Sequence, residues 1–303
     1  SAERRGDLLA QLAALRIGAQ RLCELVDANG TTHVEEAMTA LQAYSARLMR
    51  SVIRQLPDGV YHAEDWMDDD GMGHSRIPIQ VAVRIHKGSA HVDFTGTAAQ
   101  VPGGINANEA VTLAAVLYVF QLLAGTEIPA NDGLLRPIQV TAPLGSLVNA
   151  QFPAAVAGGN VETSQRIVDV VLQALAAAAP DRVPAASSGS MNNCAFGGYD
   201  PERQRHFAYY ETIAGGSGAG PHGDGESGVQ THMTNTLNTP VEAFEAAYPL
   251  RVQTYALRTR SGGRGQHRGG DGIVRELETL VPLSLTVLTE RRRLPPPGHQ
   301  GLS

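Results

Sequence analysis

The 303-residue sequence is poor in cysteine, with Cys23 and Cys194 as its two thiols. They lie far apart and form no Cys-x-x-Cys pair, which argues against a disulfide framework or a thiolate zinc site and favours a reducing compartment. A catalytic thiolate would need a neighbouring base or cation. We interpret Cys194, which follows two asparagines, as a buried structural thiol, with a reactive thiol as the alternative.

The sequence also lacks a basic excess and a long apolar run. It carries 24 Lys and Arg against 30 Asp and Glu, a net charge of -6, which argues against a general nucleic-acid binder. The one dense basic stretch, three arginines at 291–293, is typical of a solvated tail. No apolar run approaches the roughly 18 residues of a membrane span, and no signal peptide is visible. We therefore expect a cytoplasmic protein.

Two helices are predicted at the N-terminus. The first, over residues 7–28, is marked by apolar side chains at spacings of four and three: Leu8, Leu12, Leu15, Ala19, Leu22 and Val26. Asn29 and Gly30 end it, and Thr32 with Glu35 forms a capping-box pattern that opens a second helix to about residue 55. We predict an antiparallel helical hairpin at 1–58. Because this pattern begins so soon after Ser1, we expect the chain to be shortened at its N-terminus.

From residue 59 onward, strand and helix patterns mix. Strict alternation predicts a strand over 77–85 and a return strand at 92–94. The acidic segment 64–71 lacks the spacing of a calcium loop, and we interpret it as a solvated strand entry. The other expected elements are helices at 108–124, at 162–179 and after Pro240, and strands at 137–142, 194–197, 206–211, 251–258, 273–279 and 283–289. Without a regular βαβ alternation the predicted class is α+β, with mixed sheets, packed helices and glycine-rich loops in 59–303.

Glycine is abundant, with 33 residues, and it is clustered. Such clusters let the backbone approach a ligand closely and let successive N–H groups converge on an anion. None of them matches a phosphate loop or a dinucleotide-binding motif, so an independent nucleotide site is weakly supported. The clusters lie at 103–104, 158–159, 197–198, 215–228 and 262–272.

Polar side chains that accompany these glycines are the candidate site. A histidine or glutamate can activate water for attack on a carbonyl group, and amides beside glycine can recognise a planar amide ring. Convergent donors can stabilise a tetrahedral oxyanion. The candidate catalytic residues are His232, Glu211 and Glu162. The candidate substrate-binding residues are Asn160, Asn192, Asn193, Asn235, Gly215 and Gly216, and we expect all of these to surround one pocket.

Each candidate also has a structural interpretation. Asn and Gly commonly build turns, Glu162 fits the first turn of a helix, and His232 fits a structural hydrogen-bonding role. His222, Asp224 and His232 share one stretch but lack His-x-x-x-His spacing. We therefore predict no metal site in this sequence.

The sequence resembles the hydantoinase B/5-oxoprolinase family, which also includes the alpha subunit of acetone carboxylase. The resemblance covers nearly the whole chain, and its motifs occur in a fixed order. They are DFTGT at 93–97, QVPG at 100–103, AAVAGGNVETSQ at 154–165, GSMNN at 189–193, YYETI at 209–213, THMTNTLNTP at 231–240, YPLR at 248–251 and RGGDGIVRE at 268–276.

The resemblance implies an ATP-dependent hydrolase that opens the ring of a hydantoin, an N-methylhydantoin or 5-oxoproline. In this family a partner of the hydantoinase A type is expected to bind ATP and Mg²⁺ and to phosphorylate the carbonyl oxygen of the substrate. The B-type chain then takes part in hydrolysis within a heteromeric complex. Family members usually carry a longer N-terminal region, in which a divalent metal is expected, and this sequence lacks it.

Two alternatives to the hydrolase remain open from the sequence. One is a carboxylase subunit of the acetone carboxylase type. The other is a non-catalytic scaffold that binds the A-type partner, which the missing N-terminal region favours. The glycine-flanked asparagine, glutamate and histidine segments favour the two enzymatic interpretations.

Overall fold

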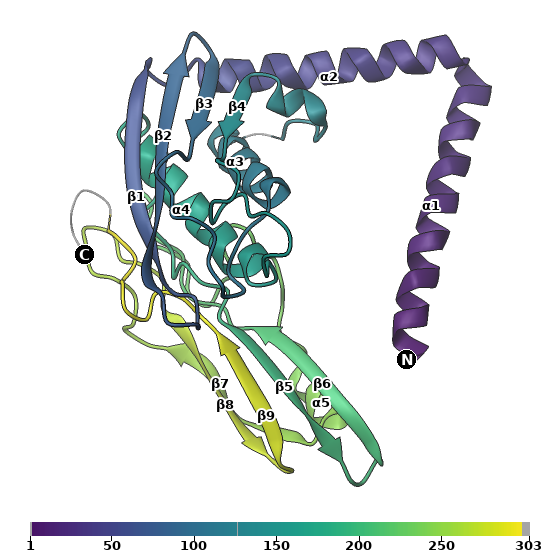
Figure 1. Cartoon of the computed structure of the whole chain (residues 1–303), viewed down its shortest axis with the longest axis vertical. Helices are drawn as coiled ribbons and strands as arrows, with labels where there is room; N and C mark the ends of the chain where they lie inside the picture. Colours follow the sequence, from purple (N-terminus) through teal and green to yellow (C-terminus); the bar gives the residue numbers. More distant parts are fainter. Residues whose placement is uncertain (1, 126, 299–303) are drawn as a thin grey trace.

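Two long helices, α1 (Ala2–Asn29) and α2 (Thr31–Ile53), open the computed structural model, which describes residues 2–125 and 127–298. The predicted pair is confirmed, but α1 leaves α2 at a wide angle and stands apart from the body of the molecule (Figure 1). The antiparallel packing that we predicted is therefore wrong. Leu8 and Leu15 of the apolar stripe are 61% and 71% exposed. The capping box does not form either, because Gly30, with φ +80°, occupies the N-cap position.

A four-stranded sheet forms the upper part of the body. Its order is β1 (Gly59–Asp69), β2 (Ser75–His86), β3 (Ser89–Asp93) and β4 (Ile138–Thr141). The first two pairings are antiparallel, and β3 and β4 run parallel. The alternation predicted for residues 77–85 is confirmed, since Ile77, Ile79, Val81, Val83 and Ile85 are all buried.

The helices α3 (Glu109–Ala124) and α4 (Ser164–Ala176) pack beside this sheet (Figure 1). The main hydrophobic core unites both helices with β2 and with Met49, Val52 and Ile53 from the last turns of α2. A short 3₁₀ helix, Asp132–Leu135, leads into β4, and a π-helical turn, Gly159–Thr163, leads into α4. The π-helical turn places the Glu162 side chain in the interior of the protein.

The lower part of the body holds two smaller sheets (Figure 1). One has the order β6 (Arg205–Thr212), β5 (Asn193–Asp200), β9 (Leu283–Leu288), and the other pairs β7 (Leu250–Arg258) with β8 (Gly272–Thr279). A second core forms where α5 (Val241–Ala247) places Phe244 against Phe196 and Leu250. The α+β class is confirmed, and no helix among the described residues is long and apolar enough to cross a membrane.

One sequence interpretation of β1 is corrected by the fold. The acidic segment 64–71 is not a solvated strand entry, because Asp65, Asp68 and Asp70 are buried. Asp70 accepts hydrogen bonds from backbone N–H groups, and Asp68 accepts them from residues 292 and 293. These carboxylates are buried because donors meet them there: Asp65 pairs with Arg291 from the C-terminal segment, and Asp70 is bonded by the turn that follows β1.

The exposure of α1 leads to a first prediction. Removing residues 1–29 should leave the melting temperature within about 2 °C of the intact chain, because α1 buries little surface against the body. Thermal unfolding followed by circular dichroism measures this. As a contrast, Met49→Ala in the buried part of α2 should destabilise the protein by about 2–5 kcal/mol. A comparable loss on removing α1 would contradict the structure.

Candidate functional site

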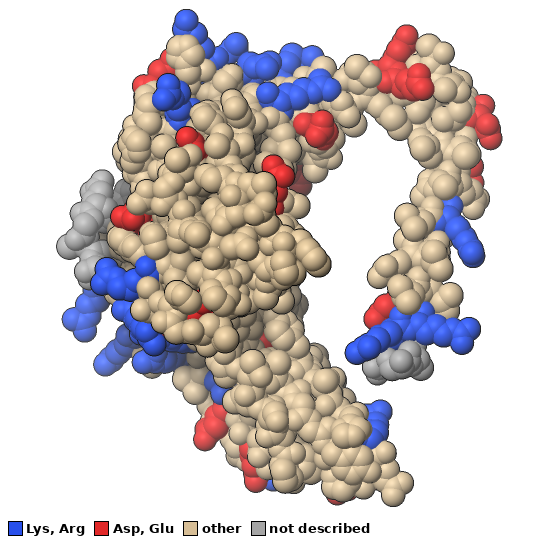
Figure 2. All heavy atoms as spheres, viewed as in Figure 1, with Lys and Arg blue, Asp and Glu red and all other residues tan. Residues whose placement is uncertain are grey.

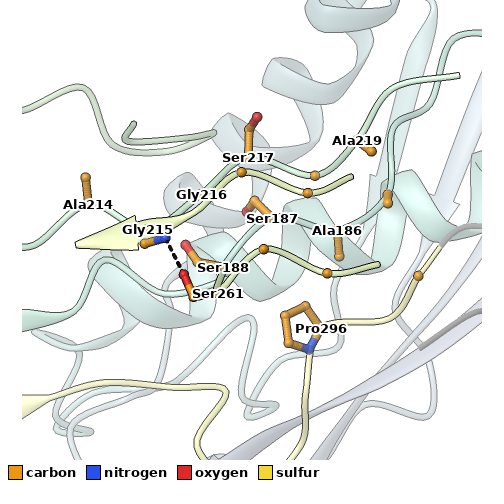
Figure 3. A pocket seen from close by; sticks show the side chains of 18 of the residues that line it. Ala186, Ser187, Ser188, Ala214, Gly215, Gly216, Ser217, Ala219, Ser261 and Pro296 are labelled. Carbon is orange, nitrogen blue, oxygen red and sulfur yellow. Dashed lines mark hydrogen bonds between the residues drawn. The ribbon is translucent and has the colours of Figure 1, made fainter. Parts of the chain in front are cut away.

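A cavity of about 810 Å³ opens between the glycine-rich segments of the lower body (Figure 3). Residues 185–188, 213–221, 261–267 and 269–270 contribute most of its wall, and Cys194 of β5, Arg275 of β8 and Val287 of β9 extend it. Its lining is rich in glycine and in the hydroxyl groups of Ser187, Ser188, Ser217 and Ser261, four side chains labelled in Figure 3.

Glycine is required where the segments of this wall touch backbone to backbone. A Cβ atom on Gly216 would lie 1.9 Å from the Gly270 carbonyl oxygen, and one on Gly218 would lie 1.8 Å from that of Ala185. The Ser188 N–H donates to the Gly216 carbonyl oxygen at 3.0 Å, which ties two of the segments together. The glycine clusters thus allow loops that are distant in sequence to close around one space.

Three of the predicted substrate-binding residues, Asn192, Gly215 and Gly216, line this cavity. Asn192 has a φ of +50° and donates through Nδ2 to the Ile213 carbonyl oxygen at 3.1 Å. Its Oδ1 accepts a hydrogen bond from an Arg292 terminal nitrogen at 2.6 Å. Asn192 therefore holds an arginine at the wall of the cavity.

Glu211 lies behind the cavity wall. Its Oε1 accepts from Arg275 Nε at 2.7 Å, and its Oε2 accepts from the Tyr209 hydroxyl and from Asn238 Nδ2. The Arg275 side chain is 1% exposed, and its guanidinium lies over the ring of Tyr255 at 4.8 Å. Glu211 is thus an acceptor with both oxygens occupied, and it positions Arg275.

Asn193 and Glu162 form a separate buried pair. Asn193 Nδ2 donates to Glu162 Oε1 at 2.6 Å, the Met191 N–H donates to the same oxygen at 3.1 Å, and the Tyr210 hydroxyl donates to Asn193 Oδ1. Burial, with a smaller contribution from the negative charge of the neighbouring Glu290, raises the pKa of Glu162 to about 8. Neighbouring residues on a strand face opposite sides, so Asn193 turns away from the cavity that the next residue of β5, Cys194, lines.

A cluster of buried charges, missed by the sequence analysis, extends from this pair along α4. Arg166 lies 3.4 Å from both Asp65 and Asp169 and 3.5 Å from Glu290. Arg291 binds the same two aspartates at 2.6 and 2.8 Å with its side chain 3% exposed. The predicted solvated tail at 291–293 is therefore wrong for Arg291, which is buried. Asp169 inside an apolar helical run was the sequence signal for this cluster, because a lone buried carboxylate requires a partner.

His232 lies at the edge of this cluster. Its Nε2 is 3.9 Å from Asp169 Oδ1, its Nδ1 is 3.5 Å from the Tyr118 hydroxyl, and its side chain is 9% exposed. Burial lowers the pKa of His232 to about 4, so the ring is neutral at pH 7. Asn160 and Asn235 are exposed. The predicted site residues therefore do not surround one pocket, because only three of them reach the cavity.

Cys194 lines the cavity as a thiol. Burial raises its pKa, as does the negative charge of Glu211. The structural interpretation of this cysteine agrees with that direction, because a reactive thiolate needs a lowered pKa. Within residues 2–125 and 127–298, no group of three or more His, Cys, Asp or Glu side chains is arranged to hold a metal ion.

Comparison with known proteins identifies the family. A family model described as hydantoinase B/oxoprolinase matches residues 1–302. The chain belongs to this family. It is 41% identical to 5-oxoprolinase 1 of Arabidopsis thaliana over 97% of its length, and 36% identical to a putative B-type subunit of a D-/L-hydantoinase from a Pseudomonas species, again over 97%. It spans 23% of the first relative and 51% of the second.

Solved structures confirm the fold of this hydantoinase B/oxoprolinase chain. An ATP-dependent caprolactamase from Pseudomonas jessenii matches with a TM-score of 0.81 and 33% identity, over 91% of this chain and 48% of that one. A nucleotide-free acetone carboxylase matches with a TM-score of 0.76 and 19% identity, over 89% and 38%. The second likeness concerns the fold alone.

The buried carboxyl groups make the stability of this family member dependent on pH. The folded-state pKa of Glu162 lies above its ordinary value of 4.5. The folded protein therefore keeps a proton between pH 4.5 and about 8 that the unfolded chain releases. The stabilisation is complete below the lower value and is lost as the pH rises to the upper one. Glu290, whose pKa burial raises to about 7, acts in the same direction.

We expect Glu162→Gln to weaken this pH dependence, because glutamine is a neutral isostere of the protonated acid. The variant should match the parent within about 1 kcal/mol near pH 5 and exceed it above about pH 8. Urea unfolding at a series of pH values measures the difference. Glu202→Gln, in the exposed turn between β5 and β6, is the matched control. Identical pH profiles for Glu162→Gln and the parent would refute a neutral Glu162.

Proposed function

We propose that this chain is part of an ATP-dependent enzyme that opens cyclic amides, and that the cavity described above receives the ring. The observation that carries the proposal is the 33% to 41% identity, over nearly the whole chain, to relatives named caprolactamase and 5-oxoprolinase. Both names refer to enzymes that act on a cyclic amide. The acetone carboxylase alternative rests on the fold alone, so we place it second.

The lining of the cavity suits such a ring. A cyclic amide presents an N–H donor and a C=O acceptor in one plane. The backbone groups, the serine hydroxyls and the Asn192 side chain of the lining include acceptors for the N–H and donors for the C=O. The volume of about 810 Å³ exceeds that of a small ring and leaves room for a further group on it. In the net reaction the ring C–N bond breaks, one water molecule adds its oxygen to the carbonyl carbon and the ring nitrogen gains a proton. A second water molecule releases the phosphoryl group taken from ATP as inorganic phosphate, and ADP is the other product.

ATP and Mg²⁺ enter this proposal through a partner of the hydantoinase A type. That partner would transfer the terminal phosphoryl group of ATP to the carbonyl oxygen of the ring, which makes the carbonyl carbon a better electrophile. The described residues of this chain then bind and orient the activated ring. The Pseudomonas relative is named as one subunit of a hydantoinase, and this name supports the existence of a partner.

The predicted catalytic residues take supporting roles in this proposal. Glu211 positions Arg275 in the cavity wall, and Glu162 holds Asn193 at the start of β5, because neither acid lines the cavity. His232 is neutral at pH 7 and carries an unprotonated nitrogen, as a general base requires. We propose that His232 contributes through its contact with Asp169, whose oxygen Oδ1 lies 3.9 Å from the ring nitrogen Nε2. Asn160 and Asn235, as substrate-binding residues, stay predictions.

The proposal is tested by reconstituting the chain with an A-type partner, ATP and Mg²⁺. The substrates are 5-oxoproline, hydantoin, N-methylhydantoin and caprolactam, and the readouts are ring-opened product and ADP. We expect ATP-dependent ring opening of at least one of these compounds. An inactive complex that still assembles would favour the scaffold interpretation instead.

A glycine substitution locates the reaction in the cavity. Gly263 lines the cavity, and a Cβ atom added to it would meet no other group within 4 Å, so Gly263→Leu adds bulk without a clash at its first carbon. It should raise KM about tenfold or more, equivalent to about 1.4 kcal/mol of lost binding. Gly104→Leu, equally free of neighbours but outside the cavity, is the matched control. Equal KM values for the two variants would place the ring elsewhere.

A further inference from the structure

We propose that the cavity contains a binding site for a phosphoryl group, formed by Arg258, Arg264 and Arg292. This inference deepens the proposed function and rests on it, because it names the charged group that the ligand carries, but the site can be tested without turnover. It depends on the distribution of charge around the cavity and on which of the arginines have partners.

The lining of the cavity is strongly cationic although the chain as a whole is acidic. Four arginines line it against one carboxylate, Asp181, while the whole chain has a net charge of -6. Basic side chains also gather near the C-terminal segment in Figure 2. A concave site with charge of one sign raises the local concentration of ligands of the opposite sign.

Arg275 is the one arginine of the four whose charge is neutralised. Its Nε donates to Glu211 at 2.7 Å, and its guanidinium lies over the rings of Phe244 and Tyr255 at 5.4 and 4.8 Å. The two terminal nitrogens are buried and have no hydrogen-bond partner among the described residues. Arg275 therefore belongs to the wall and is not counted as a ligand.

Arg292 differs because its partners carry no charge. Its Nε donates to Thr289 Oγ1 at 3.2 Å, and a terminal nitrogen donates to Asn192 Oδ1 at 2.6 Å. These two hydrogen bonds fix the guanidinium at the wall without compensating its positive charge. An oriented guanidinium of this kind is suited to hydrogen bonding with an oxyanion.

Arg258, at the end of β7, and Arg264, in the loop between β7 and β8, complete the site. Both are exposed. Neither side chain forms a hydrogen bond or an ion pair within residues 2–125 and 127–298. With Arg292 they give three uncompensated positive charges against Asp181, more than a neutral ring requires.

The number and kind of donors favour a phosphoryl group over a carboxylate. A phosphoryl group presents three oxygens and close to two negative charges at about pH 7, whereas a carboxylate presents two oxygens and one charge. The Ser188 hydroxyl, labelled in Figure 3, forms no hydrogen bond with a described residue and adds a neutral donor. Three guanidinium groups and this hydroxyl match the larger anion.

The binding of inorganic phosphate to the whole chain, measured by isothermal titration calorimetry, tests the site. We expect saturable binding of one phosphate per chain that weakens as salt is added. Arg258→Ala and Arg264→Ala should each weaken it about tenfold, as expected for the loss of one charge-assisted contact. Arg84→Ala, an exposed arginine on β2 outside the cavity, is the matched control and should leave the affinity unchanged.

Three results would overturn the proposal: no saturable phosphate binding, equal affinities for the parent and the Arg258→Ala/Arg264→Ala double variant, or binding of acetate as tight as that of phosphate. The proposed function fails separately. Intact phosphate binding without ring opening by the reconstituted complex would remove the function and keep the site, whereas ring opening that is unaffected in the double variant would keep the function and remove the site.

Discussion

The buried cluster of Arg166, Arg291 and their carboxylates joins the parts of this fold that the sequence keeps far apart. Asp65 comes from β1, Asp169 and Arg166 from α4, and Arg291 from the segment after β9. Removing one member of such a cluster would leave a buried charge without a partner, which typically destabilises a protein by about 3–5 kcal/mol. The cluster therefore fixes the end of β9 against the upper sheet and α4.

That anchoring also determines the cavity. Arg291 and Arg292 are neighbours in sequence, and the first is buried in the charge cluster while the second lines the cavity. Asn193 and Asn192 divide in the same way at the start of β5, with Glu162 on one side and Arg292 on the other. The cavity wall is thus attached directly to the core, and its arginine is held by residues whose backbone the core positions.

Sequence patterns predicted the parts of this structure that depend on local periodicity. The alternation at 77–85, the helix at 108–124 and the glycine clusters that line the cavity all follow from the residues themselves. The position of α1 and the burial of Asp65 and Arg291 could not be predicted from local sequence patterns. The two buried charges, for example, are partners 226 residues apart. A charged residue in an exposed tail and one in a buried ion pair have the same sequence signature until those partners are known.

The same reasoning explains why only part of the predicted set lines the cavity. Asn192, Gly215 and Gly216 line it because glycine and asparagine build the close turns of its wall, and their role in substrate binding stays a prediction. Arg292 was overlooked because a run of three arginines usually indicates a solvent-exposed segment. What decides the role of an arginine here is the charge of its acceptor. Glu211 neutralises Arg275 and makes it structural, whereas Asn192 and Thr289 orient Arg292 and leave its charge available to a ligand.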